Sequence, residues 1–370
     1  MQKTLLAFSA IVLAATSQAE NARFYVGTYT DGPQGGKGVY TATLDTATGK
    51  LAPVSLAAAG DSPNFWVVSK NGKFAYASLG RKTGEVGAYT VQPDGSLKLL
   101  NVQPSGGDIA CQISLDAADK HVFVSNFGTG DVSCFPIQPD GSLGAASDHI
   151  KLAELAPGAD HPEKPHAHCA TTDAQDRFAY ICDLGSDKIW TFDFDSGKGT
   201  LTLAAPPSVS TPAGSGPRHI VFSPNGRFAY VNNESGLSVT TLARDEKTGA
   251  LTPLETVSTL PAEAKPIKAT TGEIACHPSG KWLYVSNRGA DNIAVFAIAE
   301  DGRLTLIQNA PSEVQFPRAM GLDPSGRWLV TAGQNDSRIA VLKVDEKTGL
   351  LSATDQSASI PTPVSVTFAP

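Results

Sequence analysis

Four ionisable side chains of this 370-residue chain have the types that hydrolysis or rearrangement of a small ester requires. They are His168, Arg218, Glu234 and Arg288. Guanidinium groups can hold a carboxylate or phosphate by paired hydrogen bonds and can stabilise an oxyanion. An imidazole can move a proton near neutral pH, and a carboxylate can orient it or activate water. The four residues are far apart in the chain, so the fold has to bring them together.

The element that must position them is a repeated β-hairpin, which is plainest at 216–235 (GPRHIVFSPNGRFAYVNNES). Its apolar, β-rich run at 220–222 is followed by Ser-Pro-Asn-Gly, in which proline presets φ and glycine accepts a positive φ. A second run at 228–231 then returns along the first. The same hairpin recurs at 65–78, 109–125, 168–182, 274–286 and 320–331.

The hairpins recur with a nearly constant spacing. Their second strands are expected to begin at Phe24, Phe74, His121, Phe178, Phe228, Trp282 and Trp328. These positions are 46 to 57 residues apart, and the intervals contain only strand patterns. Each repeat also has an outer half, whose turn begins with Asp and ends near Gly, as in DEKTG at 245–249. A period of this size built from four strands predicts a β-propeller.

The two ends of the chain are expected to complete one blade. RFYVGT at 23–28 matches a second strand with no first strand before it, whereas VSVTFA at 364–369 matches a first strand with no turn after it. Pairing these segments closes the ring and removes its sheet edges. The sequence therefore predicts an all-β fold, a single seven-bladed β-propeller over 20–370 with four-stranded antiparallel blades.

Placing the repeats in register locates the candidate side chains. His168, Arg218 and Arg318 each stand ten residues before the start of a second strand, so they share one position at the mouth of the central channel. Glu234 and Arg288 each stand six residues after such a start, which places them on the same face in neighbouring blades. The alternative is that the arginines and Glu234 form an ion-paired scaffold that bridges blades.

Two longer repeats add residues to the same face. The segments 153–165 and 262–271 both lead into first strands. The residues that follow them, His166 and Glu273, are candidates for contacts with a substrate, together with Arg318.

The histidines of this region allow a second interpretation. His161, Glu163, His166 and His168 lie within eight residues, a grouping that could hold a metal ion. We expect no metal, because only a regular strand turns both rings of a His-x-His segment to one side, and a proline-rich segment surrounds this one. His219, one residue beyond the candidate arginine of its blade, is expected to point toward the blade interior and to be structural.

Three units of the chain resemble the lactonase family of seven-bladed propellers. They read GPRHIVFSPNGRFAYVNNE, EIACHPSGKWLYVSNRGADNIAVF and PRAMGLDPSGRWLVTAGQNDSRIAVL, and the resemblance covers the whole mature chain. The family includes propeller-type 6-phosphogluconolactonases and fungal carboxy-muconate cyclases. The resemblance implies hydrolysis of a sugar δ-lactone without a cofactor or, in the cyclase branch, interconversion of a lactone with a muconate. A non-catalytic binding propeller is the third possibility.

In the cyclase branch the residues proposed for catalysis are one His, two Arg and one Glu. By resemblance, the His of the HxH segment is His168, the Arg of GPRH is Arg218, the Glu of the NxE segment is Glu234 and the Arg of SNRG is Arg288. These are the four residues that the register places together. No serine stands in a Gly-x-Ser-x-Gly setting, so attack by water is expected rather than an acyl-enzyme.

The first 19 residues predict export. Lys3 is followed by an apolar run at 5–15 and by Ser17-Gln18-Ala19, a small-x-small cleavage site. Residues 1–19 therefore match a secretory signal peptide, too short for a stable membrane span, and we expect a periplasmic protein. Export does not suit a phosphorylated cytosolic metabolite. An unphosphorylated aldonolactone such as gluconolactone is thus a candidate substrate beside 6-phosphoglucono-1,5-lactone.

Charge and cysteine content limit the partners. The net charge is −7 and no run of Lys or Arg occurs, which argues against nucleic acid and membranes as partners of the mature chain. We expect a monomer that acts on a small-molecule lactone or an anionic sugar acid. Of the five cysteines, Cys169 and Cys182 lie on the two strands of one hairpin and could form a disulfide. Equally, all five could be small buried hydrophobes.

Overall fold

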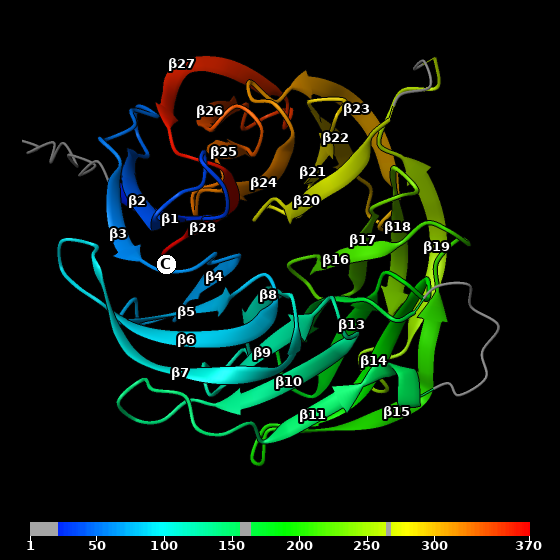
Figure 1. Ribbon diagram of the computed structural model, residues 1–370. Helices are drawn as coiled ribbons and strands as arrows, with labels where there is room; N and C mark the ends of the chain where they lie inside the picture. Colours follow the sequence, from blue (N-terminus) through cyan, green and yellow to red (C-terminus); the bar gives the residue numbers. More distant parts are fainter. Residues whose placement is uncertain (1–20, 156–163, 264–267) are drawn as a thin grey trace, which may run out of the picture.

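The computed structural model describes residues 21–155, 164–263 and 268–370 and contains seven four-stranded antiparallel sheets, arranged as blades around a central axis (Figure 1). The expected signal peptide, 1–19, lies outside these residues. In the described ranges the only helix is the short 3-10 helix η1 (Leu152–Glu154). No helix there is both long and apolar enough to cross a membrane. The predicted seven-bladed, all-β fold is confirmed.

Within each blade the strands are consecutive in the chain, except in the blade that joins the two termini. Blade 1 consists of β28 (Pro363–Phe368), β1 (Asn21–Thr28), β2 (Gly38–Asp45) and β3 (Ser55–Ala59). Blade 2 consists of β4 (Phe65–Val68), β5 (Phe74–Leu79), β6 (Thr83–Val91) and β7 (Leu97–Asp108). Blade 3 consists of β8 (Ala110–Leu115), β9 (His121–Asn126), β10 (Asp131–Pro136) and β11 (Asp148–Lys151).

The other four blades follow the same order. Blade 4 consists of β12 (Ala167–Thr172), β13 (Phe178–Asp183), β14 (Lys188–Asp195) and β15 (Thr200–Ser210). Blade 5 consists of β16 (Pro217–Phe222), β17 (Phe228–Asn233), β18 (Ser238–Arg244) and β19 (Leu251–Ser258). Blade 6 consists of β20 (Thr270–Cys276), β21 (Trp282–Arg288), β22 (Asn292–Ile298) and β23 (Leu304–Pro311). Blade 7 consists of β24 (Pro317–Leu322), β25 (Trp328–Gly333), β26 (Arg338–Val344) and β27 (Leu351–Ser359).

The inner hairpins form where the turn residues require them. In blades 2 to 7 the second strand begins at the residue expected from the repeat, and only blade 1 differs, because β1 begins earlier, at Asn21. Between β16 and β17, the Ser223 hydroxyl accepts a hydrogen bond from the Phe228 amide at 3.0 Å. Gly226 in the same turn has a φ of 67°, which glycine adopts without a steric penalty.

The two termini close the ring in blade 1. Strand β28 pairs antiparallel with β1, with Val26 opposite Val366. The Gly27 amide donates a hydrogen bond to the Ser365 hydroxyl at 3.2 Å. In Figure 1 the red C-terminal strand lies beside the blue N-terminal one. The closure predicted from the half-repeats is therefore confirmed.

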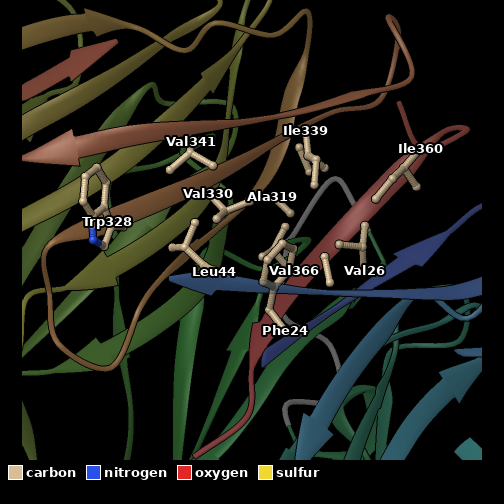
Figure 2. Packing of buried hydrophobic residues seen from close by; sticks show 12 residues of the cluster. Phe24, Val26, Leu44, Ala319, Trp328, Val330, Ile339, Val341, Ile360 and Val366 are labelled. Atoms are coloured by element: carbon tan, nitrogen blue, oxygen red, sulfur yellow. The ribbon is translucent and has the colours of Figure 1, made fainter. Parts of the chain in front are cut away.

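Apolar side chains fill the spaces between blades. Figure 2 shows the cluster between blades 1 and 7, where Leu44 lies next to Val330 and Phe24 lies beside Val366. Burial of each such side chain contributes about 1.5–3 kcal/mol to stability. The indole nitrogen of Trp328 is satisfied across the same interface, since it donates to the Thr46 carbonyl at 2.9 Å.

The outer turns also connect neighbouring blades. Four buried tyrosine hydroxyls each donate to a glycine carbonyl in the outer turn of the next blade, which removes the cost of burying them. The pairs are Tyr25 with Gly95, Tyr76 with Gly141, Tyr180 with Gly249 and Tyr284 with Gly349, at 2.9 to 3.2 Å. These glycines have φ between 70° and 88°, so the geometry that the four turns share depends on glycine.

The cysteines remain thiols. Cys169 and Cys182 stand opposite each other in the register of β12 and β13, as expected from the hairpin, but all five cysteines are free. The two are buried in one apolar cluster with Tyr180 and Ile220. Cys134, Cys169 and Cys182 are small buried side chains, as in the second expectation, whereas Cys111 and Cys276 are only partly buried.

Candidate functional site at the channel mouth

A β-bulge at the start of the first strand positions the central residues. In blades 4, 5 and 7 the register between the first two strands slips by one residue, and the extra residue is His168, Arg218 or Arg318 respectively. A bulge changes the direction in which a side chain points. All three residues lie near the start of the first strand, beside the end of the antiparallel second strand. The shared position predicted from the sequence is therefore present. In blade 3 the corresponding extra residue is Cys111.

Glu234 joins two arginines from neighbouring blades. It follows β17 directly; its Oε2 accepts a hydrogen bond from Arg218 Nε at 3.0 Å and forms an ion pair with Arg288 Nη2 at 2.9 Å. The structure thus brings together three of the four predicted catalytic residues in direct contact.

Backbone carbonyls of β20 fix the two guanidinium groups further. Arg218 Nη1 donates to the Gly272 carbonyl at 2.6 Å, and Arg288 Nη2 donates to the Thr271 carbonyl at 2.7 Å. A Cβ at position 272 would lie 2.6 Å from the Ser286 hydroxyl and 2.7 Å from the Pro317 carbonyl, so only glycine fits. The close approach of β20 to the arginines therefore depends on a residue without a side chain.

The charges in this cluster stabilise one another. Burial alone would raise the pKa of Glu234, but the guanidinium groups of Arg218 and Arg288 lower it below its usual value, so the carboxylate is ionised at neutral pH. Burial and the neighbouring Arg218 lower the pKa of Arg288 to about 10, which still leaves it protonated. The site therefore offers fixed positive groups around a single carboxylate.

His168 lies beside this cluster and has no polar partner of its own. Its side chain is 5% exposed and contacts the rings of Phe127 and His219 edge-on, at centroid distances of 5.7 and 5.1 Å. Among the described residues no group hydrogen-bonds to either ring nitrogen, and Nδ1 is buried. Burial, followed by the charge of Arg218, holds the pKa of His168 well below its ordinary value. The imidazole is therefore neutral and carries one donor and one acceptor for a ligand.

His166 is held by the scaffold. Its backbone amide donates to Asp183 Oδ1 at 2.9 Å, and its ring stacks on Phe127 at a centroid distance of 4.5 Å. Its Nδ1 donates to the Phe127 carbonyl at 2.7 Å, so only the other ring nitrogen is available to a substrate. His161 and Glu163 lie outside the described residues. In the part of the chain that the structure describes, no three His, Cys, Asp or Glu side chains are grouped closely enough to hold a metal ion.

Glu273 and His219 form a second pair in the mouth, which differs from the expectation for His219. The bulge at Arg218 interrupts the alternation of β16, so His219 stays on the side of the site instead of pointing into the blade. Its Nδ1 lies 2.6 Å from Glu273 Oε1, and its Nε2 lies 3.0 Å from Arg218 Nη1. Glu273 was predicted to contact substrate, but in the structure its carboxylate is engaged by a histidine of the next blade.

Arg318 lies in β24 of blade 7, beside the blade that supplies Arg288 and Glu273. Its guanidinium carbon is 5.5 Å from the ring centroid of Tyr29, and that of Arg81 is 4.2 Å from the same ring. Arg81 is paired with Asp31 at 3.0 Å, whereas Arg318 has no carboxylate within 4.0 Å among the described residues. Arg318 is thus a positively charged group at the mouth that forms no ion pair with a described residue.

The first strands surround a cavity that leads away from this site. It has a volume of about 570 Å³, includes Glu273 in its wall and extends to Pro370. A second cavity of about 710 Å³ adjoins it, since Pro324 and Pro370 line both, and none of the predicted site residues lies in its wall. The polar cluster is therefore confined to one end of the channel.

The chain belongs to the lactonase family of seven-bladed β-propellers. The sequence profile of this family, described as Lactonase, 7-bladed beta-propeller, matches residues 23–368.

Particular members of the family are similar over almost their whole length. The 6-phosphogluconolactonase of Bacillus subtilis (strain 168) is 32% identical over 348 residues, which are 93% of this chain and 97% of that protein. A Bacteroides fragilis protein proposed to be a 6-phosphogluconolactonase has a crystal structure that is 30% identical, with a TM-score of 0.86 over 96% of this chain and 99% of that one. The periplasmic gluconolactonase of Pseudomonas aeruginosa is 27% identical, with a TM-score of 0.86 over 95% and 99% of the two chains.

Proposed function

We propose that the protein hydrolyses the ester bond of a sugar δ-lactone by attack of water. The observation that carries this proposal is the convergence of Arg218 and Arg288, from neighbouring blades, on one oxygen of Glu234 beside the unpartnered imidazole of His168. Lactonase relatives that span nearly the whole chain support the same reaction class.

The arginines supply the electrostatic part of the reaction. Attack of water on the lactone carbonyl places a negative charge on its oxygen, and fixed N–H donors stabilise such an oxyanion. Arg288 Nε is buried and has no hydrogen-bond partner among the described residues, so it is one donor available for this purpose. Glu234 holds both guanidinium groups in place and stays ionised while it does so.

His168 supplies a hydrogen-bonding group that is not engaged elsewhere. A neutral imidazole can donate from one nitrogen and accept at the other, which suits contact with the lactone ring oxygen and an adjacent hydroxyl. As the ring opens, that oxygen becomes an alkoxide, and a donated hydrogen bond lowers the energy of its departure.

The substrate is proposed to be the 1,5-lactone of an aldonic acid, with or without a 6-phosphate. The Bacillus subtilis relative is named for the phosphorylated substrate and the Pseudomonas aeruginosa neighbour for gluconolactone. The secretory signal expected at 1–19 and the periplasmic neighbour support a periplasmic enzyme and thus the unphosphorylated lactone.

Proton release after mixing with each lactone tests the proposal. The purified mature protein is mixed with glucono-1,5-lactone or 6-phosphoglucono-1,5-lactone, and the rate is corrected for spontaneous hydrolysis. We expect acceleration with at least one of them. An Arg218→Ala preparation purified in parallel controls for a contaminating lactonase, because a contaminant would be equally active in both. If neither lactone is turned over faster than in buffer, the proposal is wrong, and a carboxy-muconate substrate or ligand binding without turnover becomes the next test.

A further inference from the structure

The attacking water must lose a proton, and the mouth contains three groups that could take it. They are Glu234, His168 and the pair formed by His219 and Glu273. The three groups differ in whether the basic atom already accepts a hydrogen bond and in whether a neighbouring residue orients it. A general base needs a free lone pair and a partner that stabilises its protonated form.

Glu234 is poorly placed to act as the base. Its Oε2 is already ion-paired with Arg218 and Arg288 at 3.0 and 2.9 Å. Protonation would place a neutral carboxyl between two guanidinium groups, and their charges hold the pKa of Glu234 low against the effect of burial. A carboxylate so stabilised is a weak base.

His168 lacks the partner that a base needs. No carboxylate contacts its ring in the described part of the chain, and its polar neighbours are positively charged or neutral. Burial lowers the pKa of His168, and the positive charges of Arg218 and Arg318 lower it further, so all three disfavour the imidazolium. Accepting a proton would therefore leave an unpaired charge in a buried position.

His219 has such a partner. Its Nδ1 lies 2.6 Å from Glu273 Oε1, so Nδ1–H donates to the carboxylate and Nε2 keeps its lone pair. His219 is 4% exposed and Glu273 is 9% exposed. The backbone amide of Glu273 donates a hydrogen bond to the Ser286 hydroxyl at 2.8 Å, which fixes the strand at this residue. The pair comes from neighbouring blades: His219 follows the bulge of β16, and Glu273 lies within the irregular stretch of β20.

We propose that His219 Nε2 takes the proton of the attacking water and that Glu273 positions this imidazole. This inference rests on the proposed lactonase activity. Arg218 Nη1 lies 3.0 Å from Nε2 and 3.2 Å from Nδ1, so it sits against the face of the imidazole. The lone pair of Nε2 points along the plane of the ring and is left for a water molecule. Arg218, on the face of the same ring, can donate to the oxyanion that forms in the same step.

The proposed reaction returns the proton of the attacking water to the sugar. Water oxygen bonds to the lactone carbonyl carbon, its proton moves to His219 Nε2, and the carbonyl π electrons move to the oxygen held by the arginines. Collapse of this tetrahedral intermediate breaks the bond from the carbonyl carbon to the ring oxygen. The ring oxygen takes the proton back from His219, and the product is an aldonic acid that ionises in water.

The charged and titratable groups around His219 determine its response to pH. They are Glu273 on β20, Arg218 on β16, His168 on β12 and Arg318 on β24. Burial lowers the pKa of His219, Glu273 opposes this, and the arginines add to the lowering. Activity should therefore fall on the acid side as His219 is protonated. Loss of the Glu273 charge should lower the pKa further and move that acid limb to lower pH.

Two variants test the assignment, with kcat and kcat/KM measured across pH. We expect His219→Gln to lower kcat by about 10²-fold or more, the typical contribution of a general base. Glu273→Gln keeps a hydrogen-bonding side chain of the same size, so we expect a smaller loss of kcat together with an acid limb at lower pH. A merely structural role for Glu273 would lower activity without moving the limb.

The chain contains a matched control. His121 at the start of β9 is 5% exposed and pairs with Asp116 Oδ2 at 2.8 Å, but it lies at the turn end of its strand, away from the mouth. His121→Gln should leave kcat and the acid limb unchanged. Thermal unfolding of all three variants separates loss of folded protein from loss of turnover.

The outcomes distinguish this inference from the proposed function. A wild-type protein that hydrolyses neither lactone contradicts the lactonase proposal itself. A wild-type lactonase with a folded His219→Gln variant of undiminished kcat, or with an unmoved acid limb in Glu273→Gln, overturns only the assignment of His219 and Glu273.

Discussion

Two buried arginine–carboxylate clusters in this propeller use the same groups but differ in how completely their donors are satisfied. Near the inner turn of blade 4, Asp173 accepts from the Arg177 and Phe178 amides at 2.7 and 3.1 Å and from Arg244. Arg244 donates its other N–H groups to the Tyr180 hydroxyl and the Gly226 carbonyl. Each nitrogen of this guanidinium has a partner within the protein.

The cluster at the mouth is not saturated in this way. Arg288 Nε and His168 Nδ1 are buried without hydrogen-bond partners in the described part of the chain, and Arg318 lies over the face of Tyr29 with no carboxylate within 4.0 Å among the same residues. Buried donors without partners cost stability, typically about 1–3 kcal/mol each. Other buried polar atoms without partners, such as Trp66 Nε1 and the Tyr230 hydroxyl, lie in different blades, whereas the mouth places two of them beside the ion pairs of Glu234. We infer that the mouth is organised for a ligand and the Asp173 cluster for stability.

The largest effect expected from this comparison is on stability at the saturated cluster. Arg244→Met leaves Asp173 buried with one partner fewer, so we expect the free energy of unfolding to fall by about 3–5 kcal/mol. Turnover of the remaining folded protein should match the wild type, because the cluster lies away from the mouth. Denaturant unfolding and kcat, measured on one preparation, test the expected loss of stability and the expected unchanged turnover. A folded Arg244→Met protein with reduced kcat would contradict the assignment of the Asp173 cluster to stability alone.

The reverse pattern is expected for Arg218. Arg218→Ala removes a donor to the developing oxyanion, so we expect kcat/KM to fall by about 10²–10³-fold. Stability should change less than in Arg244→Met, because Glu234 keeps its contact with Arg288 and is partly open to solvent. Steady-state kinetics and thermal unfolding measure the two effects. If this variant unfolds as easily as Arg244→Met and its folded fraction retains full activity, Arg218 is a scaffold residue.

The sequence predicts the saturated parts of this molecule better than the mouth. Repeats of turn residues and apolar runs are local signals, so the second strands of six blades begin at the predicted residues, from Phe74 to Trp328. The shared positions of His168, Arg218 and Arg318 follow from the same register. A repeated chain thus specifies both its strands and the positions that its blades have in common.

The missed features depend on departures from regular strands. Strand alternation directs His219 away from Arg218, but a bulge of one residue in β16 returns it to the site, and a one-residue slip in β20 brings Glu273 to it. No residue type marks these bulges in the sequence. Gly272, where a side chain would collide with Ser286, is the one local signal that could have indicated the close approach.

His168 is expected to have a smaller effect than Arg218. Because its ring has no polar partner in the described residues, His168→Ala breaks no hydrogen bond of the free protein. We expect kcat to fall by about 10²-fold if the imidazole handles a proton or binds the ring oxygen in the transition state. His166→Ala is the neighbouring control, because its ring stacks on Phe127 and donates to that residue's carbonyl. Equal kcat in His168→Ala and wild type would remove His168 from the mechanism.

Arg318 should sharpen the comparison by revealing which ligand the unsaturated side of the mouth binds. A charge-assisted hydrogen bond to a phosphate contributes about 1.5–3 kcal/mol, and a tenfold change in kcat/KM corresponds to about 1.4 kcal/mol. If Arg318 contacts a phosphate, Arg318→Gln should lower kcat/KM for 6-phosphoglucono-1,5-lactone about tenfold more than for glucono-1,5-lactone. Arg81→Gln is the matched control, because its guanidinium lies on the same Tyr29 ring but is already paired with Asp31. An equal loss for both lactones would show that Arg318 acts on the part of the substrate that the two share, which is the lactone itself.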